Sequence, residues 1–325
     1  MKLVTLRVDG ANHVGALIDA GSAVLDLTAA APEATAFTSM RHLISSGEAG
    51  LALADRVLDE HPISAVVPVE DAVLRAPLPD PVRMRDCTLF TAHLEPAFQA
   101  LARQQAAAAD DPAAEHERLI ATGNYGLPPV LREQPVYYTC DHLAVSGPDD
   151  EIVAPPDSTR LDYELELGIV LGRTASDVSA EQAAELVFGW TIFNDWSLRD
   201  TQARVMQGNL GPGLGKDLPG GTTLGPCIVT RDEIGDPYAL EMTARVNGVE
   251  WSRGNSSTIT HRVEDALALF SRGRTLHAGE VLGSGTVLGG SGFEIGRQLK
   301  DGDVVELEVA GIGVLRNRVR YSNRD

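Results

Sequence analysis

Cysteine is scarce in this chain of 325 residues, which contains only three. Cys87, Cys140 and Cys227 lie far apart and form no C-x-x-C pair. We therefore expect neither a disulfide framework nor a zinc site built from thiolates. This pattern favours a reducing compartment.

Long apolar runs are also missing. The chain contains no stretch of about 18 apolar residues, the length that a membrane-spanning helix needs. Its first residues, MKLVTLRVDGANHVG, lack the apolar segment of a signal peptide. We therefore expect a cytoplasmic protein that is neither secreted nor bound to a membrane.

Positive charge is the third deficit. Lys and Arg number 27 against 46 Asp and Glu, which gives a formal net charge of -19. No Lys/Arg-rich run interrupts this excess, so nucleic acid is not an expected partner. Most of the carboxylates are expected to form a solvated acidic surface, which leaves only a few for function.

Common nucleotide and nucleophile motifs are absent. The glycine-rich stretch 211–216 has Leu210 and Asp217 where a P-loop requires Gly and Ser or Thr. Lys216 takes the place of the third glycine of a G-x-G-x-x-G fingerprint, and no G-x-S-x-G elbow occurs. Neither nucleotide binding nor serine acyl-enzyme chemistry is predicted.

Residues 1–80 are predicted to form a small N-terminal α+β domain. Turn signals at Asp9-Gly10 and Gly21-Ser22 divide residues 1 to about 30 into an antiparallel meander. A helical stretch is expected over about 34–60 and a strand over 65–74. The prolines at 77, 79 and 81 favour a linker after it.

Residues 81–325 are predicted to form a larger, strand-dominated domain of mixed roll or barrel type, so that the fold class is α+β. A helical excursion over about 91–133 is expected to act as a lid. Further helices are expected near 179–187 and 263–271.

The segment 161–172, LDYELELGIVLG, alternates as a strand does. Its leucines and Ile169 share one face, while Glu164 and Glu166 share the other, about 7 Å apart along the strand. Paired carboxylates at this spacing suit a hard divalent cation. The same pattern also fits a solvent-facing strand, so a further carboxylate is needed.

The segment 189–202, GWTIFNDWSLRDTQ, is predicted to be a strand that runs straight into a helix. Asp195 lies at the strand end, where functional carboxylates often emerge. Ser197-x-x-Asp200 has the spacing of a capping box, so helix initiation is the simpler interpretation of these two residues.

These two segments belong to an ordered series of blocks. The series continues with LGKD at 214–217, TTLGP at 222–226, RVNGVEWSRGN at 245–255 and GEVLGSGT at 279–286. Together they closely resemble the fumarylacetoacetate hydrolase family from about residue 85 onward. The resemblance implies a β-rich roll, a homodimer, and Mg²⁺, Mn²⁺ or Ca²⁺ held by a Glu-x-Glu pair and a distant Asp, with Mg²⁺ preferred.

The resemblance assigns roles to individual residues. Glu164, Glu166 and Asp195 match the metal ligands, and Asp86 stands where one branch of the family has a fourth. His93 resembles the catalytic histidine and Glu294 the glutamate that orients it. Without the resemblance, His93 would be interpreted as an exposed helix residue, Glu294 as an exposed strand residue and Asp86 as a linker aspartate.

The resemblance also predicts substrate contacts, from Arg199, Gln202, Lys216, Thr286 and Tyr138. Lys216 would in addition stabilise a catalytic oxyanion. Two tyrosines expected from the family are replaced here by Thr88 and Met206, and the loop after Lys216 is lengthened around 219–221. These differences argue against fumarylacetoacetate itself as the substrate and leave the metal ligands in place.

The resemblance therefore implies hydrolysis of a carbon-carbon bond in a small diketo acid, an acylpyruvate or a fumarylacetoacetate-like compound, in aromatic or sugar-acid catabolism. Decarboxylation or isomerisation of a 2-keto acid, as by an oxaloacetate decarboxylase or hydroxymuconate-type tautomerase, is the alternative enzymatic function. The non-enzymatic alternative is a metal-binding or scaffold protein without catalytic activity.

Overall fold

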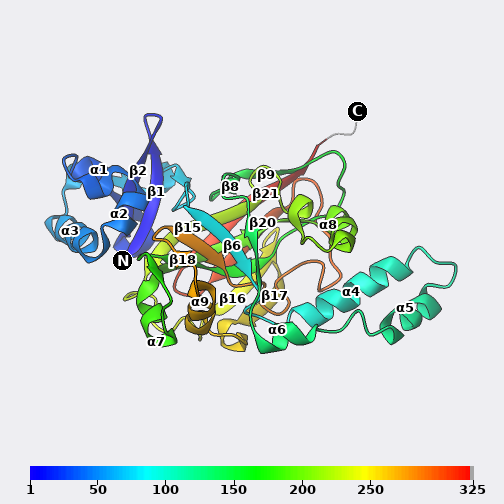
Figure 1. The fold of residues 1–325 in the computed structure, drawn as a ribbon. Coiled ribbons are helices and arrows are strands. Elements are labelled where there is room, and N and C mark those ends of the chain that lie inside the picture. The colour runs from blue at the N-terminus through cyan, green and yellow to red at the C-terminus, as the bar shows by residue number, and fades with distance from the viewer. Residues whose placement is uncertain (323–325) are drawn as a thin grey trace.

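The computed structural model describes residues 1–322. Its main feature is a large sheet of 12 strands, which joins strands of the first 80 residues to strands of the rest of the chain (Figure 1). In spatial order its path is β4 (Val66–Pro68), β3 (Ala23–Asp26), β2 (Ala11–Ile18), β1 (Lys2–Val8), β15 (Thr222–Thr230), β13 (Val187–Asp195), β11 (Leu165–Leu171), β19 (Glu280–Gly283), β6 (Arg83–Cys87) and β7 (Tyr137–Cys140). Off this path, β5 (Leu74–Arg75) pairs with β1 and β8 (Val145–Ser146) with β15.

A second sheet of 5 strands accompanies the first. It consists of β17 (Val249–Asn255), β16 (Glu241–Val246), β20 (Val304–Val309), β21 (Gly313–Tyr321) and β9 (Glu151–Ala154). Two strand pairs complete the β structure, β10 (Leu161–Asp162) with β14 (Ser197–Leu198) and β12 (Ala175–Ser176) with β18 (Thr275–Leu276). The predicted strand-dominated α+β roll is confirmed.

The helices are α1 (Leu27–Ala30), α2 (Met40–Ser45), α3 (Gly47–Glu60), α4 (Leu94–Ala106), α5 (Pro112–Ala121), α6 (Pro129–Glu133), α7 (Ala180–Ala183), α8 (Arg199–Val205) and α9 (Val263–Ser271). Figure 1 shows α1 to α3 beside β1 and β2, and α4 and α5 extending at the opposite end of the molecule. Within residues 1–322, no helix combines the length and apolar character needed to cross a bilayer.

The N-terminal meander forms as predicted, because β1, β2 and β3 pair antiparallel. The helical stretch over 34–60 is divided, since Ser39 adopts an extended conformation and its side chain caps α2 by accepting from the His42 amide. The prediction of a single strand over 65–74 is wrong in detail, because a 3-10 turn at Val69–Asp71 separates β4 from β5. Strand β1 also pairs with β15, so the large sheet includes strands from both predicted domains. The division at residue 80 stays a prediction.

The alternation predicted for the Glu-x-Glu strand determines what lies on each face. Leu165, Leu167, Ile169 and Leu171 join a core shared with the second sheet, whereas Val170 packs in the cluster that includes α2 and α3. Glu166 has the same parity as Val170, so its side chain points away from the core that the leucines join. Strand β11 lies between β13 and β19, and β6 follows β19, which brings three carboxylate-bearing strands together.

Candidate metal centre and catalytic dyad

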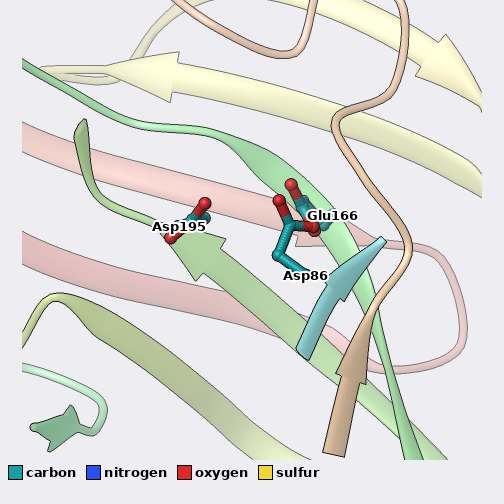
Figure 2. A group of neighbouring side chains, drawn as sticks. All are labelled: Asp86, Glu166 and Asp195. Carbon is teal, nitrogen blue, oxygen red and sulfur yellow. The ribbon is translucent and has the colours of Figure 1, made fainter. Parts of the chain in front are cut away.

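Three carboxylates from separate strands meet in the large sheet. Asp86 on β6, Glu166 on β11 and Asp195 at the end of β13 each offer an oxygen atom, and these atoms all lie within 4.8 Å of one another. Figure 2 shows the three side chains converging from their strands. Glu166 and Asp195 are buried. The structure thus brings together three of the four predicted metal ligands.

A glycine makes room for this convergence. Gly283 on β19 lies opposite Asp86 in the parallel pairing with β6 and opposite Gly168 in the pairing with β11. A Cβ atom on Gly283 would lie 2.6 Å from Glu166 Oε2 and 3.1 Å from Asp86 Oδ1. The absence of a side chain at position 283 therefore leaves the space in which these two carboxylates lie.

Burial and mutual repulsion disfavour three negative charges here. Burial, and then the charge of Asp195, raise the pKa of Asp86 to about 8. Burial, and then Asp86 and Asp195, hold the pKa of Glu166 well above its usual range. Burial raises the pKa of Asp195 to about 6, although Lys216 lowers it. Asp86 Oδ1 is buried and has no hydrogen-bond partner among the described residues. An all-oxygen donor set with an unpartnered buried carboxylate oxygen fits a hard divalent cation.

Glu164, the fourth predicted ligand, lies outside this cluster. Its Oε1 is 2.7 Å from Arg199 Nη1, and its Oε2 accepts from Lys216 Nζ at 2.7 Å. Burial alone would raise the pKa of Glu164, but Lys216 and Arg199 hold it well below its usual range. Both carboxylate oxygens are thus paired with cations, and the metal-binding role of Glu164 stays a prediction.

Lys216 supplies a positive charge next to the cluster of Asp86, Glu166 and Asp195. Its buried ammonium group donates to Glu164, to Asp195 Oδ2 at 2.5 Å and to Ser197 Oγ at 2.7 Å. Burial lowers the pKa of Lys216, but Asp195 and Glu164 outweigh that effect and raise it above its usual range. The residue therefore carries a fixed positive charge at the edge of the cluster.

Arg199 is anchored by a residue that the sequence analysis assigned no role. Its Nε and Nη2 donate to Asp162 Oδ2 at 2.9 and 2.7 Å, and Asp162 also accepts from the amides of Gly292 and Phe293. Gln202 Oε1 accepts from Arg199 Nη1 at 3.0 Å. Asp162 is the first residue of the DYELE motif, and this position was the one signal in the sequence that could have pointed to a role for it. Its partners lie far away in the sequence.

The capping-box interpretation of Ser197 and Asp200 is wrong. Helix α8 begins at Arg199 with Leu198 as its N-cap, and no side chain caps it. Ser197 Oγ accepts from Lys216, and Asp200 accepts from the Ser158 hydroxyl at 2.6 Å and the Thr159 amide at 2.8 Å. Because β14 occupies positions 197 and 198, the helix starts too late for Ser197 to cap it.

His93 and Glu294 form the predicted pair across 201 residues of sequence. His93 Nδ1 lies 2.7 Å from Glu294 Oε2, which also accepts from the Gly289 amide at 2.9 Å. His93 is buried at the start of α4 rather than exposed. The contact orients the imidazole and leaves Nε2 as the nitrogen that can exchange a proton with a ligand.

Two residues predicted to contact substrate lie against the carboxylate cluster. The Tyr138 hydroxyl donates to Asp195 Oδ2 at 2.6 Å, and the Thr286 hydroxyl donates to Glu166 Oε1 at 3.3 Å. The Gly285 amide adds a bond of 2.9 Å to Glu166 Oε2. These donors fix the orientation of the carboxylates, as supporting residues around metal sites do. Their substrate contacts stay predictions.

The sequence matches the model of a known protein family and resembles several known proteins. Residues 110–320 match the model of the fumarylacetoacetate (FAA) hydrolase C-terminal family. An oxaloacetate tautomerase of Bacillus subtilis is 34% identical over 191 residues, which are 58% of this chain and 62% of the relative. A 2,4-didehydro-3-deoxy-L-rhamnonate hydrolase of a Sphingomonas species is 36% identical over 189 residues, 57% of this chain and 65% of the relative. The chain thus aligns with less than two thirds of the length of these relatives.

Solved structures share the fold over nearly the full chain. A fumarylacetoacetate hydrolase from Exiguobacterium antarcticum has a TM-score of 0.72 and 26% identity, and the match covers 99% of this chain and 100% of that one. A maleylpyruvate hydrolase from a Sphingobium species, in complex with manganese (II) and pyruvate, has a TM-score of 0.72 at 22% identity and the same coverage. The protein belongs to the fumarylacetoacetate hydrolase family.

Proposed function

We propose that this protein is a divalent-metal-dependent hydrolase that cleaves a carbon-carbon bond between two carbonyl groups of a small diketo acid, such as an acylpyruvate. The observation that carries the proposal is the buried His93–Glu294 pair, because neither decarboxylation nor tautomerisation of a 2-keto acid needs a group that activates water. Relatives with hydrolase names support the same class.

Asp86, Glu166 and Asp195 would hold the cation, with Glu164 available if Lys216 or Arg199 releases it. Mg²⁺ is the proposed ion, with Mn²⁺ or Ca²⁺ as alternatives, since all are hard cations that prefer oxygen ligands. A bound divalent cation supplies Lewis-acid stabilisation of negative charge that develops on substrate oxygen atoms.

The chain's own groups would carry the proton transfers. His93 takes a proton from water at Nε2 while Glu294 stabilises the imidazolium through Nδ1. The hydroxide adds to the distal carbonyl carbon, and Lys216 and Gln202 stabilise the resulting oxyanion. The carbon-carbon bond then breaks, and its electron pair enters the departing keto acid as an enolate. The proton that His93 took from water is returned to the enolate carbon, which gives the free keto acid.

Tautomerisation or decarboxylation of a 2-keto acid is the second candidate. Relatives named oxaloacetate tautomerases, from Bacillus subtilis and from human mitochondria, are 34% and 35% identical to this chain over 191 and 192 residues. Stabilisation of an enolate is common to both candidates, so the carboxylate cluster is compatible with either.

Product analysis distinguishes the two candidates. The protein would be incubated with Mg²⁺ or Mn²⁺ and a panel of acylpyruvates, and separately with oxaloacetate. Pyruvate and a second carboxylic acid are the expected products from an acylpyruvate. Conversion of oxaloacetate without cleavage of any acylpyruvate would favour the second candidate.

A cytoplasmic location and a homodimeric state are part of the proposal.

A further inference from the structure

One segment, residues 285–294, reaches from the carboxylate cluster to the catalytic pair. Its first residue, Gly285, donates through its amide to Glu166 Oε2 at 2.9 Å. At its other end, Glu294 Oε2 lies 2.7 Å from His93 Nδ1. The path of this segment therefore sets where the carboxylate of Glu294 lies.

Asp162 holds the segment immediately before Glu294. Its Oδ1 accepts from the Gly292 amide and its Oδ2 from the Phe293 amide, both at 3.0 Å. Asp162 is buried, so the loss of either bond would leave a polar group without water to replace it. One carboxylate thus fixes two consecutive peptide groups next to the residue that orients His93.

The Asp162 carboxylate is itself held in place. Arg199 Nε and Nη2 donate to its Oδ2, and Arg199 Cζ lies 5.2 Å from the centroid of the Phe293 ring. The segment also approaches the carboxylate closely, since a Cβ atom at Gly292 would lie 2.6 Å from Asp162 Oδ1. Any larger residue at 292 must displace the carboxylate or the backbone.

We infer that Asp162 is a positioning residue for water activation, which fixes Glu294 against His93 through the Gly292 and Phe293 amides. The inference rests on the proposed function, in which His93 takes a proton from water. Among the described residues, Asp162 forms no hydrogen bond with His93 or Glu294, so its effect passes through the backbone.

Proton NMR tests the positioning without turnover. A histidine Nδ1–H that donates to a carboxylate away from water gives a signal at unusually low field. His93 with Glu294 is one such pair, and His13 Nδ1 with Asp26 Oδ2, at 2.7 Å, is a second that serves as an internal reference. His93→Ala and His13→Ala assign the two signals.

Asp162→Asn should abolish the His93 signal and keep the His13 signal. Its NH₂ group replaces one of the two oxygens that accept from the Gly292 and Phe293 amides. Gly292→Ala should have the same effect with every charge retained, which keeps the test decisive if Asp162→Asn does not fold.

Asp26→Asn is the matched control. Asp26 is also a buried aspartate that is paired with a histidine and accepts from a backbone amide, that of Ala29 at 2.9 Å. Its replacement should abolish the His13 signal and leave the His93 signal unchanged.

Kinetics of acylpyruvate cleavage by the Mn²⁺-loaded protein add a second measurement. Asp162→Asn should lower kcat at least about tenfold, since a displacement of about 1 Å can cost about 10²-fold. In a Glu294→Gln background the same change should lower kcat less than about twofold, because groups that act as a unit are not additive. An effect through Arg199 on substrate binding should appear in KM instead.

A missing His93 signal in the wild type, or an unchanged one in both Asp162→Asn and Gly292→Ala, would overturn the inference. A full kcat effect of Asp162→Asn in the Glu294→Gln background would overturn it as well. Loss of the signal in the variants of a protein that cleaves no acylpyruvate would reject the proposed hydrolysis and leave the positioning role standing.

Discussion

Gly283 leaves the space that the carboxylate cluster occupies. A methyl group at this position would be placed 2.6 Å from Glu166 Oε2, so Gly283→Ala must displace Glu166, Asp86 or both. We expect Mn²⁺ affinity to fall at least about tenfold, as it does when residues supporting metal ligands are altered. Calorimetric titration measures the effect. Gly208→Ala is the control, because its added Cβ would meet no atom within 4 Å, and equal Mn²⁺ binding by both variants would contradict the account.

Asp195 accepts from Lys216 and Tyr138, and one of its oxygen atoms lies within 4.8 Å of oxygen atoms of Asp86 and Glu166. Asp195→Ala is expected to abolish metal-dependent activity and to remove measurable Mg²⁺ or Mn²⁺ binding. Asp80→Ala, which breaks a surface ion pair with Arg41, should bind the metal as the wild type does. Unchanged metal affinity in Asp195→Ala would refute this ligand assignment.

At the scale of elements, Asp162 links β10 to the start of α8 and to the loop that carries Glu294. Asp162→Asn would leave the buried Arg199 guanidinium with a weaker partner and would remove one of the two oxygens that accept from the Gly292 and Phe293 amides. We expect a loss of about 3 kcal/mol in the free energy of unfolding, measured with urea, because breaking a buried ion pair leaves charge uncompensated.

The partly exposed ion pair of Arg245 with Glu308 provides the comparison for Asp162→Asn. Glu308→Gln should lower the free energy of unfolding by less than about 1 kcal/mol. Equal losses in the two variants would show that Asp162 does not hold these elements together.

Sequence patterns predicted the elements better than their contacts. The period of two in β11 correctly separated Glu166 from the leucine face, because each strand residue's side depends only on its own parity. The capping box failed because β14 delays the start of α8, which no local pattern reveals. The pairing of Glu164 with Lys216 and Arg199, and the need for Gly283, depend on strands far apart in the chain. The family resemblance identified the distant pair His93 and Glu294, for which no local signal exists.

At the scale of the whole molecule, the expected assembly is a homodimer of the 34.6 kDa chain. This expectation comes from the family resemblance. Light scattering coupled to size-exclusion chromatography should give a mass near twice that of the chain. A mass near 34.6 kDa, independent of protein concentration, would contradict the dimer.

The whole account depends on His93 and Glu294 acting as one water-activating unit in the complete, metal-loaded protein. The most direct measurement is a double-mutant cycle of His93→Ala and Glu294→Gln, scored by cleavage of an acylpyruvate, with Mn²⁺ affinity measured for every variant. Each single change should reduce cleavage by about 10²-fold or more, and the double variant should lose little beyond the worse single one. Mn²⁺ affinity should stay unchanged, and conversion of oxaloacetate should be affected less than cleavage. Full cleavage activity in His93→Ala, or losses that simply multiply in the double variant, would contradict the hydrolytic mechanism.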